Sequence, residues 1–95
     1  EEERLAREQR LARLAGREEE AWRDVEALVE AKRAAEYTQA VGLLKDLDAL
    51  AERAGNLPAF RRRVQDFCER HRGKTALMKR IDAAGLNRLA GSGSA

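Results

Sequence analysis

Residues 37–86 read YTQAVGLLKDLDALAERAGNLPAFRRRVQDFCERHRGKTALMKRIDAAGL, and this stretch decides the fold. Apolar residues recur in it every three or four positions, the spacing that places side chains on one face of an α-helix. The first stripe consists of Tyr37, Ala40, Val41, Leu44, Leu47 and Ala51. Glycines separate it from a second stripe of Phe60, Val64, Phe67 and His71, and from a third of Leu77, Met78, Ile81 and Ala84. The stretch therefore predicts three amphipathic helices with buried apolar faces.

Capping residues set the expected ends of the first of these helices. Thr38 is a suitable N-cap because its hydroxyl accepts a hydrogen bond from a free backbone N–H. The helix is expected to run to Ala54 and to tolerate Gly42 in its interior. Gly55 and Asn56 then form a C-cap, since both residue types accept left-handed backbone geometry.

Proline, threonine and glycine mark the other two helices. Pro58 suits the first turn of a helix because it has no backbone N–H to leave unpaired. Gly73 is expected to end that helix, and Thr75 to cap a short last helix that Gly85 closes. The connections are only a few residues long, which favours antiparallel neighbours.

Residues 1–35 are expected to form one long helix or two helices. The first fifteen residues are strong helix formers led by three glutamates, which favour a helix N-terminus through the macrodipole. Gly16 costs about 1 kcal/mol inside a helix, so it permits either outcome. Residues 18–35 carry Trp22, Val25 and Val29 on one face, and a tryptophan at helical spacing is typical of a core anchor.

The fold class predicted from these patterns is all-α, with four to five antiparallel helices in hairpins, as a small bundle or a tetratricopeptide-like array. A chain of 95 residues suits one small domain. We divide it into an N-terminal segment (1–35), a three-helix hairpin module (36–90) and a linker tail (91–95). The residues expected in the core are Trp22, Tyr37, Leu44, Phe60 and Phe67.

The net charge of +2 hides a strong asymmetry between the two halves of the chain. Residues 1–54 carry ten Lys and Arg against fourteen Asp and Glu, whereas residues 55–95 carry nine against three. Such a division indicates either docking of one half on the other or a basic surface for an acidic partner. We favour the intramolecular interpretation.

No grouping of residues predicts catalysis, a cofactor or a metal site. Cys68 and His71 lie three apart on one predicted helix, but they are the only Cys and His, and a structural zinc site needs four ligands. The glycines are isolated, so no phosphate-binding loop is present. The lone cysteine excludes an internal disulfide and suits the cytoplasm, and no apolar run approaches the roughly 18 residues of a membrane span.

A basic cluster after Gly55 supplies the candidate partner-binding residues. They are Arg61, Arg62, Arg70, Lys79 and Arg80. Residues 58–84 give a helix, a glycine turn and a helix, which superficially suggests a DNA-reading motif, but the last helix has hardly any side chains suited to base readout. Contact with the phosphate backbone is therefore the most that this cluster supports as an alternative.

The spacing of the apolar residues resembles a known family. The runs YTQAVGLLKDLDALAERAG and FRRRVQDFCERHRGKTALMKRIDAAGL resemble the helical C-terminal region of actinobacterial proteins with a SWIM-type zinc finger. The matching positions are Tyr37, Ala40, Val41, Leu43, Leu44, Leu50, Ala51, Gly55, Phe60, His71, Lys74, Gly85 and Leu86. The family's Cys-x-Cys and Cys-x-His finger is absent, so the resemblance implies a helical region that mediates contacts and no metal site.

These observations together predict a non-enzymatic helical module for protein–protein interaction or scaffolding, as a fragment of a larger bacterial protein. Its partner is expected to be another protein or the rest of its parent chain, and not a membrane. Binding of nucleic acid through the basic second half is the alternative. Homo-oligomer formation through the sparsely apolar first helix is a third possibility.

Overall fold

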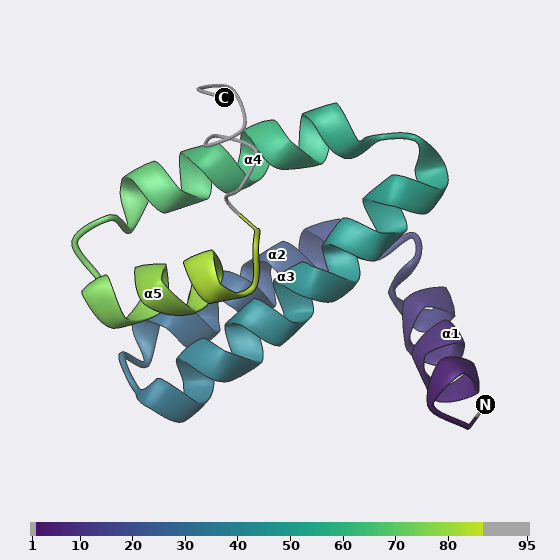
Figure 1. Cartoon of the computed structure of the whole chain (residues 1–95), viewed down its shortest axis with the longest axis horizontal. Helices are drawn as coiled ribbons and strands as arrows, with labels where there is room; N and C mark the ends of the chain where they lie inside the picture. Colours follow the sequence, from purple (N-terminus) through teal and green to yellow (C-terminus); the bar gives the residue numbers. More distant parts are fainter. Residues whose placement is uncertain (1, 87–95) are drawn as a thin grey trace.

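The computed structural model describes residues 2–86, which form five α-helices and, within that range, no strand (Figure 1). The helices are α1 (Glu2–Leu14), α2 (Glu18–Glu30), α3 (Ala34–Ala54), α4 (Leu57–Arg70) and α5 (Thr75–Ala83). The predicted all-α class is confirmed. The predicted linker at residues 91–95 lies outside the described residues.

Four of the helices make two hairpins that lie against each other. Helices α2 and α3 form the first hairpin, and α4 and α5 form the second (Figure 1). The two first helices, α2 and α4, run in the same direction, and α4 and α5 both pack against α3. Helix α3 is thus the central element, while α1 lies to one side and packs mainly on α3.

The core lies where α2, α3, α4 and α5 meet. All five residues expected there are buried, which confirms that prediction. Trp22 on α2 joins the two hairpins, because its ring centroid lies 5.9 Å from that of Phe60 and 6.0 Å from that of Phe67 on α4. Such tilted and edge-to-face aromatic contacts add about 0.5–1.5 kcal/mol to the burial itself. The core therefore depends on contacts far apart in the sequence.

Helix α1 is attached by few contacts. Leu11 is its buried residue, whereas Leu5 remains 61 % exposed. Ion pairs join Glu8 to Arg53 of α3, and the Nε atom of Arg10 to the Oδ2 atom of Asp46 at 3.5 Å. Most of the surface of α1 is therefore exposed to solvent.

Two turns interrupt the helices before α3. The sequence indicates the first turn, at Gly16, more clearly than the second. Gly16 has a φ of +84° and ends α1, so of the two expected arrangements the one with two helices is confirmed. The next turn spans residues 31–33 and contains Lys32 at a φ of +58°, a geometry that lysine seldom adopts.

The predicted role of Thr38 as an N-cap is wrong. Helix α3 begins at Ala34, and the Thr38 hydroxyl donates a hydrogen bond to the carbonyl oxygen of Ala34 at 3.1 Å from inside the helix. The physical reason is that the buried residues Val29 and Tyr37 must both reach the core, so the turn falls between them. Thr75 is likewise the first residue of α5 and not its cap; Lys74 holds that position.

The predicted stop at Gly55 and Asn56 is confirmed. Gly55 has a φ of +68°, and its N–H donates to Glu52 at 3.2 Å. The Asn56 N–H donates to Ala51 at 2.7 Å, which completes a Schellman motif. This turn directs the chain back along α3, where Pro58 lies in the first turn of α4 as expected.

Replacing Phe67 by alanine is expected to lower the free energy of unfolding by about 3–5 kcal/mol, because the ring is fully buried beside Trp22. Domains of this kind have about 5–15 kcal/mol in total, so the loss is a large share. Urea unfolding followed by circular dichroism measures it. Leu5→Ala is the control and should change the value by less than about 0.5 kcal/mol. Equal effects of the two substitutions would contradict the assigned core.

Candidate interaction site

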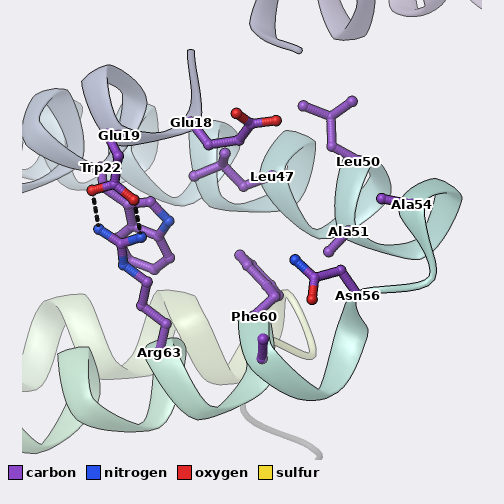
Figure 2. Close-up of a pocket in the computed structure, with 11 residues that line it drawn as sticks. Glu18, Glu19, Trp22, Leu47, Leu50, Ala51, Ala54, Asn56, Phe60 and Arg63 are labelled. Atoms are coloured by element: carbon purple, nitrogen blue, oxygen red, sulfur yellow. Dashed lines mark hydrogen bonds and ion pairs between the residues drawn. The ribbon is translucent and has the colours of Figure 1, made fainter. Parts of the chain in front are cut away.

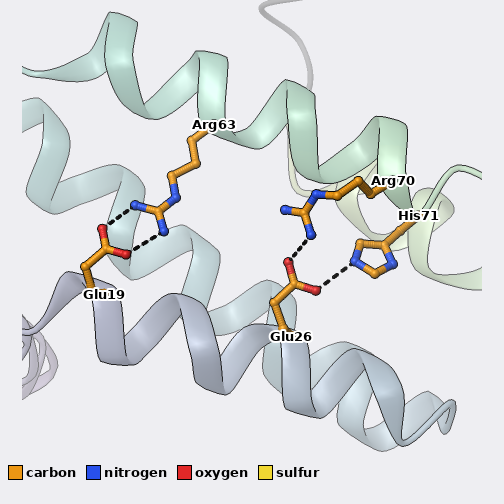
Figure 3. A network of polar contacts seen from close by, with 5 residues as sticks. All are labelled: Glu19, Glu26, Arg63, Arg70 and His71. Carbon is orange, nitrogen blue, oxygen red and sulfur yellow. Dashed lines mark hydrogen bonds and ion pairs between the residues drawn. The ribbon is translucent and has the colours of Figure 1, made fainter.

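Two ion-pair clusters connect α2 to α4 (Figure 3), and the first lies beside Trp22. The Nη1 and Nη2 atoms of Arg63 donate to the two carboxylate oxygens of Glu19, at 2.5 and 2.8 Å. The same guanidinium lies 4.6 Å from the centroid of the Trp22 ring, in a cation–π contact. The hydrogen bond from Arg63 lowers the pKa of Glu19, and the same bond raises the pKa of Arg63. Arg63 is therefore held by a carboxylate and an aromatic face together.

The second cluster is centred on Glu26. Its carboxylate accepts hydrogen bonds from Arg70 Nη1 at 2.8 Å and from His71 Nε2 at 2.9 Å (Figure 3). Burial acts to raise the pKa of Glu26, but the hydrogen bonds and charge interactions with Arg70 and His71 together outweigh it, and the pKa is lowered. Because the ionised carboxylate only accepts hydrogen bonds, Nε2 of His71 carries a hydrogen.

His71 is itself part of the core. It is the buried polar residue among the described ones, and its ring centroid lies 4.6 Å from that of Phe67. Its Nδ1 atom is buried and has no hydrogen-bond partner within residues 2–86. His71 thus closes the α4 end of the apolar core while its other nitrogen contacts Glu26, so it is a structural residue.

The two clusters fix the register of α2 against α4. Glu19 and Glu26 are seven residues apart, as are Arg63 and Arg70, so the pairs lie two helical turns apart along parallel helices. These contacts join the acidic half of the chain to the basic half. The favoured intramolecular interpretation of the charge asymmetry is confirmed for these residues.

The five residues predicted to bind a partner have different environments. Arg70 is paired with Glu26, and Arg80 donates to the hydroxyl of Thr38 at 3.3 Å and to the Ala76 carbonyl at 3.0 Å. Within residues 2–86, the Nε atom of the partly buried Arg61 has no hydrogen-bond partner, and the exposed Arg62 and Lys79 form no ion pair.

A cleft that the sequence did not indicate lies beside the first cluster (Figure 2). It has a volume of about 360 Å³ and opens where α2 begins, α3 ends and α4 begins. Its floor and walls are apolar and consist of Trp22, Leu47, Leu50, Ala51, Ala54, Ala59 and Phe60. Its polar rim consists of Glu18, Glu19, Asn56 and Arg63. Three of the lining residues are alanines, whose small side chains leave space between the helices.

Among the described residues, one carboxylate on the rim of the cleft, that of Glu18, forms no ion pair. Glu19 and Arg63 neutralise each other, whereas Glu18 accepts one hydrogen bond from the backbone N–H of Gly16 at 3.2 Å. Glu18 is exposed at the first position of α2. A ligand with an apolar group for the floor and a positive charge for Glu18 would complement this site.

Metal binding, a reactive cysteine and a membrane-spanning helix have little support in the described part of the chain. Within residues 2–86, no three His, Cys, Asp or Glu side chains form a group that would hold a metal ion. Burial, with Glu69 nearby, raises the pKa of the Cys68 thiol, which is opposite to the shift of a reactive cysteine. None of the described helices is both long and apolar enough to cross a bilayer.

No protein-family model, curated protein or solved structure matches this chain. The resemblance to the C-terminal region of SWIM-type proteins consequently stays a prediction.

The stability of the fold is expected to fall in acid through Glu26. Its pKa is lowered in the folded state from the ordinary value of 4.5, so the unfolded chain binds a proton at a higher pH than the folded chain does. The stability that Glu26 contributes at neutral pH is therefore lost as the pH falls below about 4.5. Urea unfolding at pH 7 and pH 3 measures this loss.

Glu26→Gln should lower the stability at pH 7 and reduce the difference between the two pH values. Glu30→Gln, which removes an exposed carboxylate of α2 with no ion pair among the described residues, should keep the wild-type difference. An unchanged pH dependence in Glu26→Gln would show that the second cluster does not form.

Proposed function

We propose that the chain is a non-enzymatic helical module that binds another protein, or another part of its parent chain, through the cleft between α2, α3 and α4. The observation that carries this proposal is the apolar floor of Trp22 and Phe60 beneath an open, partly charged rim. Apolar clefts with a few fixed polar groups are the usual binding sites of folded domains. The cleft lies apart from the five basic residues predicted from the sequence to bind a partner, none of which lines it.

The size of the cleft sets the kind of contact it makes. A volume of about 360 Å³ accommodates one or two large apolar side chains and not a whole folded surface. Burying one such side chain stabilises a complex by about 1.5–3 kcal/mol, so the cleft supplies an anchor point and not a complete interface. A short segment with a Leu, Met or Phe beside a Lys or Arg fits both the floor and Glu18.

The contacts that members of the basic cluster already make favour the cleft over that cluster as the partner-binding site. Arg70 and Arg80 are engaged with other groups of the same chain, so using them for a partner would first break those contacts. Leaving the buried side of Glu26 without Arg70 would carry a desolvation cost. Arg62 and Lys79 are exposed and form no ion pair within residues 2–86, so they would supplement binding without such a cost.

A peptide selection tests the proposal. The chain is immobilised, and random 12-residue peptides are selected for binding. We expect enriched peptides to combine one large apolar residue with a neighbouring Lys or Arg. Ala59→Leu narrows the cleft from an exposed wall position and should weaken binding of a labelled enriched peptide at least tenfold, measured by fluorescence anisotropy.

Ala27→Leu is the matched control, since it makes the same substitution at an exposed position of α2 that does not line the cleft. It should leave the affinity within twofold of the wild type. Circular dichroism confirms that both variants are folded. Peptides that bind equally well to both variants, or a selection that enriches none, would contradict a role for the cleft.

A further inference from the structure

A second surface, separate from the cleft, gathers positive charge between α1 and α3. A groove of about 370 Å³ is lined there by Arg7, Arg10, Gly42, Lys45 and Asp46. A neighbouring hollow on α1 shares two of these arginines and adds Arg4, Ala6 and Glu3. The two hollows form one continuous surface, because Arg7 and Arg10 line both of them.

The positive charges on this surface exceed the negative ones. Asp46 is the carboxylate of the groove and is already paired with Arg10 at 3.5 Å, and Glu3 is the carboxylate of the neighbouring hollow. The side chains of Arg4, Arg7 and Lys45 are exposed and form no ion pair within residues 2–86. Converging like charges repel one another, and an anion bound between them would relieve that repulsion.

Gly42 lines the groove at an open position. It lies inside helix α3 and is exposed, and a Cβ atom built on it would meet no atom within 4 Å. Neither packing nor a left-handed backbone therefore requires glycine at this position. Glycine is also a poor helix former, so its presence has no local structural benefit. Its effect on the groove is to expose the backbone of α3 between the arginines of α1 and Lys45.

We propose that this groove binds the phosphate backbone of duplex nucleic acid without reading its sequence. Arg4, Arg7 and Lys45 line this surface and form no ion pair within residues 2–86, so they can provide about three phosphate contacts. Guanidinium groups match phosphate oxygens in geometry as well as in charge. The lining residues include no aromatic ring for stacking and no amide side chain for base readout. This function is additional to the peptide cleft and does not depend on it.

A salt titration measures the number of phosphate contacts. A fluorescein-labelled 20-base-pair duplex is titrated with the full chain at 50 and 200 mM NaCl, and anisotropy is recorded. About three contacts predict a slope near −2.7 in log affinity against log salt, or about 40-fold weaker binding at the higher salt. Absence of binding at 50 mM NaCl would overturn the proposal.

Two substitutions of Gly42 test the position of the site. Gly42→Glu places a carboxylate in the groove, whereas Gly42→Gln adds a side chain of nearly the same size without charge, and neither meets a neighbouring atom at Cβ. We expect Gly42→Glu to bind duplex about tenfold more weakly than Gly42→Gln, with a slope about 1 smaller. Equal affinities of the two variants would overturn the proposal.

A matched pair of double variants separates the site from net charge. Arg7→Gln/Lys45→Gln should weaken binding at least tenfold, whereas Arg33→Gln/Arg72→Gln, with the same loss of charge at exposed positions elsewhere, should stay within twofold. Equal losses in both double variants, or a poly-glutamate peptide that binds the wild type as tightly as duplex, would overturn the proposal in favour of general or acidic-protein attraction.

Discussion

The packing of Trp22 against α4 is the contact on which the rest of the structure depends. Its ring lies near Phe60 and Phe67, under the guanidinium of Arg63. A two-helix hairpin of this length cannot bury its own apolar stripe, so α2 with α3 needs the second hairpin to exclude water. Trp22 supplies the largest apolar surface of α2 to that contact. The same ring forms part of the cleft floor, which links the stability of the fold to the proposed binding site.

The ion pairs around this contact specify its register more than its strength. Exposed pairs contribute about 0–1 kcal/mol each, so Glu19 with Arg63 adds little beyond what the aromatic rings provide. The pairs repeat at an interval of seven residues on both helices, however, and a slip of α4 by one turn would break both of them. The acidic first half and the basic second half of the chain thus pair with each other where one hairpin docks on the other. Only charges outside this interface, such as those between α1 and α3, remain for a partner.

Most of the helical architecture was predictable from the apolar spacing, because a stripe of period 3.6 has few alternatives to burial. The end of α3 at Gly55 was also predictable, because glycine is the residue that readily accepts the positive φ of that position. The turn at Lys32 was not predictable, because lysine is an unusual residue for a left-handed backbone. Only the positions of Val29 and Tyr37 in the core explain why the turn lies there.

The candidate sites were harder to predict than the fold. The positive charge of the second half was evident, but which arginines are paired depends on the angle and register between α2 and α4, which sequence spacing does not contain. The cleft arises from small side chains on α3 and α4 that meet only in three dimensions. The groove beside α1 was missed because residues 1–54 are acidic on average, which conceals a local excess of arginine on one face.

Nuclear Overhauser contacts of the Trp22 indole test the central claim most directly, since the chain has a single tryptophan and its ring protons resonate apart from most others. The described packing predicts cross-peaks from the indole protons to the ring protons of both Phe60 and Phe67, given their centroid separations of 5.9 and 6.0 Å. Cross-peaks from Trp22 to residues of α3 alone, with none to either phenylalanine, would contradict the docking of the two hairpins.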